Sequence, residues 1–160
     1  MTFSPELEAR LGRVIASCPP GRARSALVPM LLYAQDEVGA ITPELVAEVS
    51  RRLNLSPLQV EEVVSYYSML RRKPAGKHHI QICTNISCML VGGTELFDHA
   101  CRRLGIGNQE ATPDGQFSIE EVECLGACSW GPALQVNYDY HHDMTPEKLD
   151  RLIEELEKPR

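Results

Sequence analysis

Two pairs of closely spaced cysteines most constrain what this chain can fold into. Four residues separate Cys83 from Cys88, and three separate Cys124 from Cys128. Each pair begins where a predicted strand ends, so loops at neighbouring strand ends can bring four thiolates together. Residues 1–10 lack the basic and apolar regions of an export signal, and disulfides rarely persist in the reducing cytoplasm. These cysteines are therefore interpreted as metal ligands or redox groups.

The composition is that of a globular chain with an acidic excess. Its 160 residues include 16 Lys and Arg against 22 Asp and Glu, and 43% are apolar. This length suits one domain of usual size or two small ones. No stretch approaches the roughly 20 apolar residues that a membrane-spanning helix needs. A cytoplasmic location is expected, and nucleic acid is not expected as a partner because binding to phosphates needs a basic face.

Charge and secondary-structure signals both change near the middle of the chain. Residues 1–72 carry eight basic and eight acidic side chains, whereas residues 73–160 carry eight and fourteen. The first part is predicted to be entirely helical, and the second mixes strands with helices. A basic stretch containing Pro74 and Gly76 lies at the change. We therefore expect a helical bundle over 1–72 and a separate domain over 73–160.

Helix starts in the first part are marked by Ser or Thr followed by Pro. The hydroxyl caps free backbone N–H groups, and Pro suits the first helical position. Such starts occur at Ser4, Thr42 and Ser56, and the last predicts a helix through Tyr67, with Leu70 as its furthest extent. A fourth helix is expected from about Arg22 to Val38, with its proline in the first turn or at a kink. Four short helices predict a small bundle.

The second part alternates between strand and helix signals. A strand is followed by a helix, two further strands and a final helix, which predicts an α+β or α/β unit of thioredoxin size. The predicted elements are strand His79–Cys83, helix Thr94–Leu104, strand Phe117–Cys124, strand Ala133–Asn137 and a helix beginning at Thr145-Pro146. Pro113-Asp114-Gly115 is a turn signal between the helix and the second strand.

Thiolate ligands suit a 2Fe-2S cluster, a 4Fe-4S cluster or a tetrahedral zinc ion. Bacterial 4Fe-4S sites place cysteines about two residues apart, which neither pair does. The pairs fit a structural zinc site only loosely. A 2Fe-2S rhomb needs two cysteines on each iron, which two separated pairs can supply. A Rieske centre is rejected because the histidines at 78, 79, 99, 141 and 142 have no suitable spacing.

Several other side chains have ordinary interpretations. Cys101 lies on the apolar face of its helix and Cys18 closes the first helix, and both are interpreted as small hydrophobic fillers. Tyr66 and Tyr67 are expected in the core or at a subunit interface. The residues around His141 are expected to form a solvated loop, because adjacent histidines in a strand point to opposite faces and seldom bind one ion.

The cysteine pattern resembles a known family. The segments Cys83-x4-Cys88 and Cys124-Leu-Gly-Ala-Cys128-x3-Pro132 are similar to those of the thioredoxin-like 2Fe-2S subunit of respiratory NADH dehydrogenase, which is complex I. The resemblance covers nearly the whole chain and extends to residues 60–69, residues 74–77 and Asp114-Gly115-x-Phe117. One departure is the segment 138–142, which stands where relatives often have an acidic pair.

This resemblance implies a function. Cys83, Cys88, Cys124 and Cys128 would hold one 2Fe-2S cluster, and the fold would be a helical bundle followed by a thioredoxin-like ferredoxin domain. The bundle would help to dock a partner subunit that carries FMN and the NADH site, in the peripheral arm of a membrane-associated complex. The chain would exchange single electrons with that flavin and would not oxidise NADH alone. The alternatives are the equivalent subunit of an NAD-dependent formate dehydrogenase or hydrogenase, and a structural zinc-binding adaptor.

Overall fold

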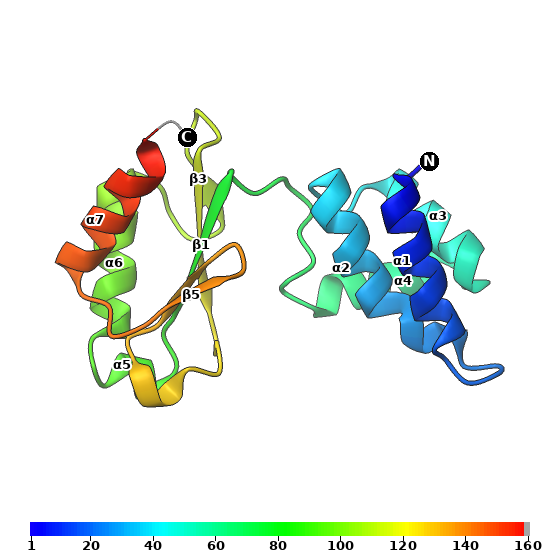
Figure 1. Cartoon of the computed structure of the whole chain (residues 1–160), viewed down its shortest axis with the longest axis horizontal. Coiled ribbons are helices and arrows are strands. Elements are labelled where there is room, and N and C mark those ends of the chain that lie inside the picture. Colours follow the sequence, from blue (N-terminus) through cyan, green and yellow to red (C-terminus); the bar gives the residue numbers. More distant parts are fainter. Residues whose placement is uncertain (159–160) are drawn as a thin grey trace. The chain divides into compact units, whose positions relative to one another are not determined.

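The computed structural model describes residues 1–158, and the chain divides into two compact units, Met1–Pro74 and Ala75–Arg160 (Figure 1). The division follows Pro74, two residues beyond the join expected after Arg72. The first unit is helical, and the second contains a five-stranded sheet with helices. No helix within residues 1–158 is long and apolar enough to cross a membrane.

Four α-helices and one 3-10 turn form the first unit. The elements are α1 (Pro5–Ala16), η1 (Ala23–Ala26), α2 (Leu27–Val38), α3 (Pro43–Leu53) and α4 (Pro57–Tyr66). The expected helix starts are confirmed, because the Ser4 and Thr42 hydroxyls accept hydrogen bonds from backbone N–H groups three residues on. Ser56 and Gln59 form a reciprocal capping box. Each of these caps satisfies N–H groups that have no intrahelical acceptor.

The structure settles the place of Pro29, which the sequence left open, and it corrects the end of the fourth helix. Pro29 lies in the first turn of α2, where its missing N–H costs no helical hydrogen bond, so no kink is needed there. Helix α4 ends at Tyr66, because Tyr67 has an extended backbone. The side chains of Tyr66 and Tyr67 are 81% and 38% exposed, so a place in the core was wrong for both.

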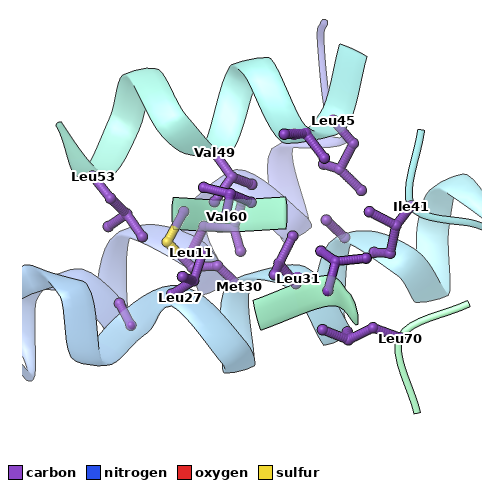
Figure 2. Packing of buried hydrophobic residues seen from close by; sticks show 14 of the residues in the cluster. Leu11, Leu27, Met30, Leu31, Ile41, Leu45, Val49, Leu53, Val60 and Leu70 are labelled. Carbon is purple, nitrogen blue, oxygen red and sulfur yellow. The ribbon is translucent and has the colours of Figure 1, made fainter. Parts of the chain in front are cut away.

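The core of the first unit gathers side chains from all four α-helices. Figure 2 shows Leu11, Met30, Leu31, Val49 and Val60 converging between the helices, and all five are fully buried. Ile41 and Leu70 close this core from the connecting segments rather than from helices. Cys18 packs against the same cluster, as expected of a hydrophobic filler. Apolar side chains from separate helices therefore meet in one interior, which confirms the predicted bundle.

The second unit is built on a five-stranded sheet in the order β2-β3-β1-β4-β5. Strands β1 and β3 are parallel, and the other neighbours are antiparallel. The strands are β1 (His78–Cys83), β2 (Glu110–Ala111), β3 (Phe117–Val122), β4 (Leu134–Val136) and β5 (Asp139–His141). The helices are α5 (Ile86–Met89), α6 (Gly93–Leu104), η2 (Cys128–Trp130) and α7 (Pro146–Glu157).

The two faces of the sheet have different chemistry. Ile80, Ile82 and Ile119 pack into the apolar core with α6 and α7, which lie side by side on one face (Figure 1). The alternate positions carry polar side chains, among them His79 and Glu120, whose atoms Nε2 and Oε2 lie 3.1 Å apart. Period-two alternation along β1 and β3 explains this division.

The expected strands and helices are present, with four additions. Helices α5 and η2 and strands β2 and β5 were not expected, and β5 corrects the solvated loop predicted around His141. Asp139 pairs with Val136, and His141 pairs with Leu134 and is half-buried. This polar segment thus joins the sheet because it forms an antiparallel hairpin with β4. The α+β fold class is confirmed.

Candidate metal centre

The parallel pairing of β1 and β3 brings the cysteine pairs to one edge of the sheet. Cys83 ends β1 and pairs in register with Val122, the last residue of β3. Cys124 follows two residues later, Cys88 lies in α5, and Cys128 begins η2. Helices α5 and η2 pack against each other. The loops that follow two parallel strands therefore meet, as the sequence predicted.

The outer pair, Cys124 and Cys128, has its two Sγ atoms 3.9 Å apart, and both residues are exposed. A tetrahedral metal with metal–sulfur bonds of about 2.3 Å holds two thiolates about 3.8 Å apart. This pair is therefore spaced as two ligands of one metal ion would be. The Cys124 side chain raises the pKa of Cys128, because two adjacent thiols cannot both ionise easily without a cation.

The inner pair, Cys83 and Cys88, is buried, with 2% exposure for each residue. Both pack with Ala127 and Ala133 in a small cluster of their own, apart from the core under α6 and α7. Burial raises the pKa of the Cys88 thiol, and the nearby Cys83 and Cys128 raise it further. Electrostatic repulsion thus links members of both pairs, and a bound cation would relieve it.

The cysteines lie as two pairs rather than as one tight group. Within residues 1–158, no three side chains of His, Cys, Asp or Glu gather closely enough to hold a single ion. All six cysteines have free thiols. A centre with two metal ions takes two thiolates on each, which is the arrangement that two pairs offer.

Backbone geometry around the pairs suits anionic sulfur. Gly126 donates its N–H to Cys124 Sγ at 3.3 Å, and its φ of +74° is a conformation that side-chain-bearing residues rarely adopt. A Cβ at Gly131 would lie 3.3 Å from Cys88 Sγ, so the chain passes close to this sulfur. The residues present therefore fit a thiolate-bound metal cluster.

Large apolar side chains near the cysteine loops are open to solvent. Ile86 and Leu90, at either end of α5, are 64% and 75% exposed, and Trp130 in η2 is 56% exposed. Met89 and Val91 are also exposed. Apolar side chains in these loops would exclude water if they covered the sulfur atoms. Those named here face solvent instead, and they form an exposed apolar surface. Such a surface beside a functional centre is typical of an interaction site.

Two features of the second unit were missed from the sequence, and only the first touches a cysteine loop. The Tyr140 hydroxyl donates a hydrogen bond to the Leu125 carbonyl at 3.0 Å, so β5 contacts the second cysteine loop. His79 lies within 2.8 Å of the Ser118 hydroxyl, and its other ring nitrogen faces Glu120. Nothing in the local sequence indicated the Tyr140–Leu125 hydrogen bond. The only sign of the His79 contacts was the presence of polar residues at alternate positions of β1.

A two-layer α+β unit with paired thiols at adjacent strand ends defines a class of protein whose thiolates bind a metal centre. Residues 11–157 match the family described as thioredoxin-like [2Fe-2S] ferredoxin, and the chain belongs to this family. The expected resemblance, the fold and the 2Fe-2S cofactor are thereby confirmed. Cys101 packs against the α6 core, as expected, and is half-buried.

Two relatives match this chain over most of their length. It is 40% identical over 154 residues to "NADH-quinone oxidoreductase subunit 2" of Thermus thermophilus, covering 96% of this chain and 85% of the relative. It is also 40% identical over 154 residues to an NADH-quinone oxidoreductase subunit of Rhizobium meliloti, covering 96% and 88%. Both relatives are subunits of an oxidoreductase with several subunits.

A solved structure shares the fold. An "NAD+-reducing [NiFe]-hydrogenase in the H2-reduced state" matches with a TM-score of 0.68 and 22% identity. The match covers 82% of this chain and 23% of the hydrogenase chain, so it spans about a quarter of that longer chain. The likeness establishes the fold alone.

Proposed function

We propose that this chain is a one-electron carrier subunit of an NADH:quinone oxidoreductase, with one 2Fe-2S cluster held by Cys83, Cys88, Cys124 and Cys128. The observation that carries this assignment is the 3.9 Å spacing of the Cys124 and Cys128 sulfurs beside the buried pair Cys83 and Cys88. Family membership supplies the cluster type. Cys18 and Cys101 pack against apolar cores and have no part in this ligand set.

The protein surroundings adjust how readily an electron is accepted. A bound 2Fe-2S cluster supplies reversible one-electron chemistry. Residues 73–160 carry fourteen acidic and eight basic side chains, and this negative field opposes the arrival of an electron beside four thiolates. The N–H of Gly126 donates a hydrogen bond to Cys124 Sγ, and this bond offsets part of that field. The chain is therefore suited to a carrier of low potential.

The partner in this proposal is a subunit that binds FMN and NADH. The sequence has no Gly-rich strand-to-helix turn of the dinucleotide-binding kind. Support comes from the names of the relatives and from the exposed apolar residues Ile86, Leu90 and Trp130 beside the cysteine loops. The helical unit, with Tyr66 exposed at the end of α4, would dock a neighbouring subunit in the peripheral arm.

Metal analysis of anaerobically purified chain tests the cluster assignment. We expect two irons and two sulfides for each chain and an S = 1/2 EPR signal after dithionite reduction. Cys88→Ser and Cys124→Ser should abolish or severely alter that signal. Cys101→Ser is the matched control, because this thiol lies on α6 in the apolar core. One zinc without sulfide, or unaltered spectra in both ligand variants, would overturn the assignment.

Co-purification tests the parent complex. A tagged copy of the chain, expressed in its native host, should bring down a flavoprotein that contains FMN. NADH should then reduce the EPR-active centre only when that flavoprotein is present. Recovery of hydrogenase or formate dehydrogenase subunits, in place of quinone-linked ones, would assign the chain to one of those assemblies instead.

A further inference from the structure

The second cysteine loop is held from two sides through a single peptide group. Tyr140 donates its hydroxyl proton to the Leu125 carbonyl oxygen at 3.0 Å. The N–H of Gly126 belongs to the same peptide group and donates to Cys124 Sγ at 3.3 Å. One end of this peptide therefore faces Tyr140, and the other faces a proposed ligand sulfur.

Planarity makes the two contacts interdependent. In a trans peptide the C=O and N–H bonds point in opposite directions, so fixing the oxygen also fixes the direction of the N–H. Gly126 has a φ of +74° and lacks a Cβ, so its own conformation restrains this peptide plane weakly. The hydroxyl of Tyr140 supplies the missing restraint from outside the loop.

Tyr140 is well anchored for this purpose. It lies on β5 and pairs with Gln135 of β4, which in turn pairs with Gln81 of β1, the strand that ends at Cys83. The sheet that positions the first cysteine pair therefore also positions this hydroxyl. Leu125, the acceptor residue, packs against the small cluster containing Cys83 and Cys88.

We propose that Tyr140 is a positioning residue that directs the Gly126 N–H at the Cys124 sulfur and thereby raises the reduction potential of the centre. A hydrogen bond to the carbonyl polarises the peptide and strengthens the N–H as a donor. N–H groups at a ligand sulfur favour the more negative, reduced state. The inference rests on the proposed function, since it takes Cys124 to be a cluster ligand.

The test is a redox titration of full-length Tyr140→Phe, followed by EPR. This change removes the hydroxyl and keeps the ring. We expect the equilibrium constant for reduction to fall about three- to tenfold, which at 59 mV per tenfold is a decrease of about 30–60 mV. The g values should also change, while iron and sulfide content stay at the wild-type level. Tyr138→Phe is the control, because it removes a hydroxyl from the same hairpin and leaves the Tyr140–Leu125 bond intact.

Each outcome decides the proposal. A wild-type cluster with equal potentials in wild type, Tyr140→Phe and Tyr138→Phe would overturn the role of Tyr140 and leave the proposed function standing. A wild-type chain without a cluster would overturn the proposed function instead. If Tyr140→Phe folds but loads less iron, the proposal is tested by amide hydrogen exchange of the metal-free Tyr140→Phe and Tyr138→Phe chains. Faster exchange at residues 124–128 than in Tyr138→Phe supports the inference, and equal exchange overturns it.

Discussion

Gly93 lies so close to Cys83 that a Cβ at position 93 would stand 2.7 Å from the Cys83 carbonyl oxygen. The same Cβ would lie 2.9 Å from the carbonyl carbon and oxygen of Cys88. Helix α6 begins at this glycine and packs against α5. The backbone segments that present both inner cysteines therefore close directly onto the first turn of α6.

Gly93→Ala should displace the first cysteine loop. The neighbouring atoms belong to the backbone and cannot rotate away, so we expect the second unit to lose about 2 kcal/mol of stability or more. Iron content after reconstitution should fall with it. Gly12→Ala is the matched control, because a Cβ there meets no atom within 4 Å and α1 should gain up to about 1 kcal/mol. Wild-type iron content and stability in Gly93→Ala would contradict this account. Urea unfolding and iron analysis provide the measurements.

The buried side chain of Gln35 ties the segment after α4 to α2. Its amide nitrogen donates to the Met69 carbonyl at 3.0 Å, and its oxygen accepts the Arg71 N–H at 2.6 Å. Gln35→Met keeps the volume and leaves both backbone groups without this partner. We expect a loss of about 1–3 kcal/mol in urea unfolding and faster amide exchange at Arg71. Unaltered exchange at Arg71 would contradict this expectation, because it would show that water replaces the Gln35 side chain without loss of stability.

Stability of the first unit should depend on pH through Glu48. The Arg51 guanidinium, with that of Arg52, holds the pKa of this carboxyl at about 2, against an ordinary value of 4.5. Between these values the unfolded chain binds a proton that the folded chain does not, so stability falls as pH falls. The contribution is complete above about pH 4.5 and lost near pH 2.

Glu48→Gln tests this pH dependence. At neutral pH we expect it to lower the free energy of unfolding by about 1–2 kcal/mol, since a pKa unit is worth about 1.4 kcal/mol and solvent around the exposed Arg51 screens the pair. The difference from wild type should shrink steadily from about pH 4.5 downward. Glu6→Gln, at an exposed position of α1, controls for the loss of one negative charge. A difference that stays constant down to about pH 2 would exclude this linkage.

Trp130 should report cluster loading. It is the single tryptophan of the chain and lies two residues beyond Cys128, with a 56% exposed side chain. Iron–sulfur centres absorb where tryptophan emits, so the loaded chain should lose most of its tryptophan fluorescence and regain it when iron is chelated. Trp130→Phe should abolish the signal in both forms. Equal emission from loaded and metal-free chain would place the centre away from η2.

Helix starts were predictable because their determinants are local. The capping box of Ser56 and Gln59 is complete within four residues, and neither residue needs a distant partner. Strand β2 could not be predicted in this way. It has two exposed residues, Glu110 and Ala111, and it is a strand only because Ile119 and Ser118 pair with them. Helix α5, with four residues, is too short to show a periodic pattern.

The candidate site also has features that are local in sequence and features that depend on distant partners. The spacing within each cysteine pair can be read directly from the sequence, and the loops that carry the pairs do follow adjacent strand ends. Tyr140 reaches Leu125 only because β4 and β5 fold back on each other, and Gly93 meets Cys83 only after α5 has formed. The exposure of Tyr66 likewise depends on where α4 ends, which the apolar pattern did not specify.

The in-register pairing of β1 with β3 has a consequence for recognising distant relatives. It is this pairing, and not the 35 residues between Cys88 and Cys124, that aligns the two cysteine loops. Insertions or deletions in the connection through α6 and the turn at Gly115 would leave the aligned strand ends where they are. A search pattern should therefore keep the two short intervals fixed and let the long interval vary, since evolution can change its length without moving a single sulfur.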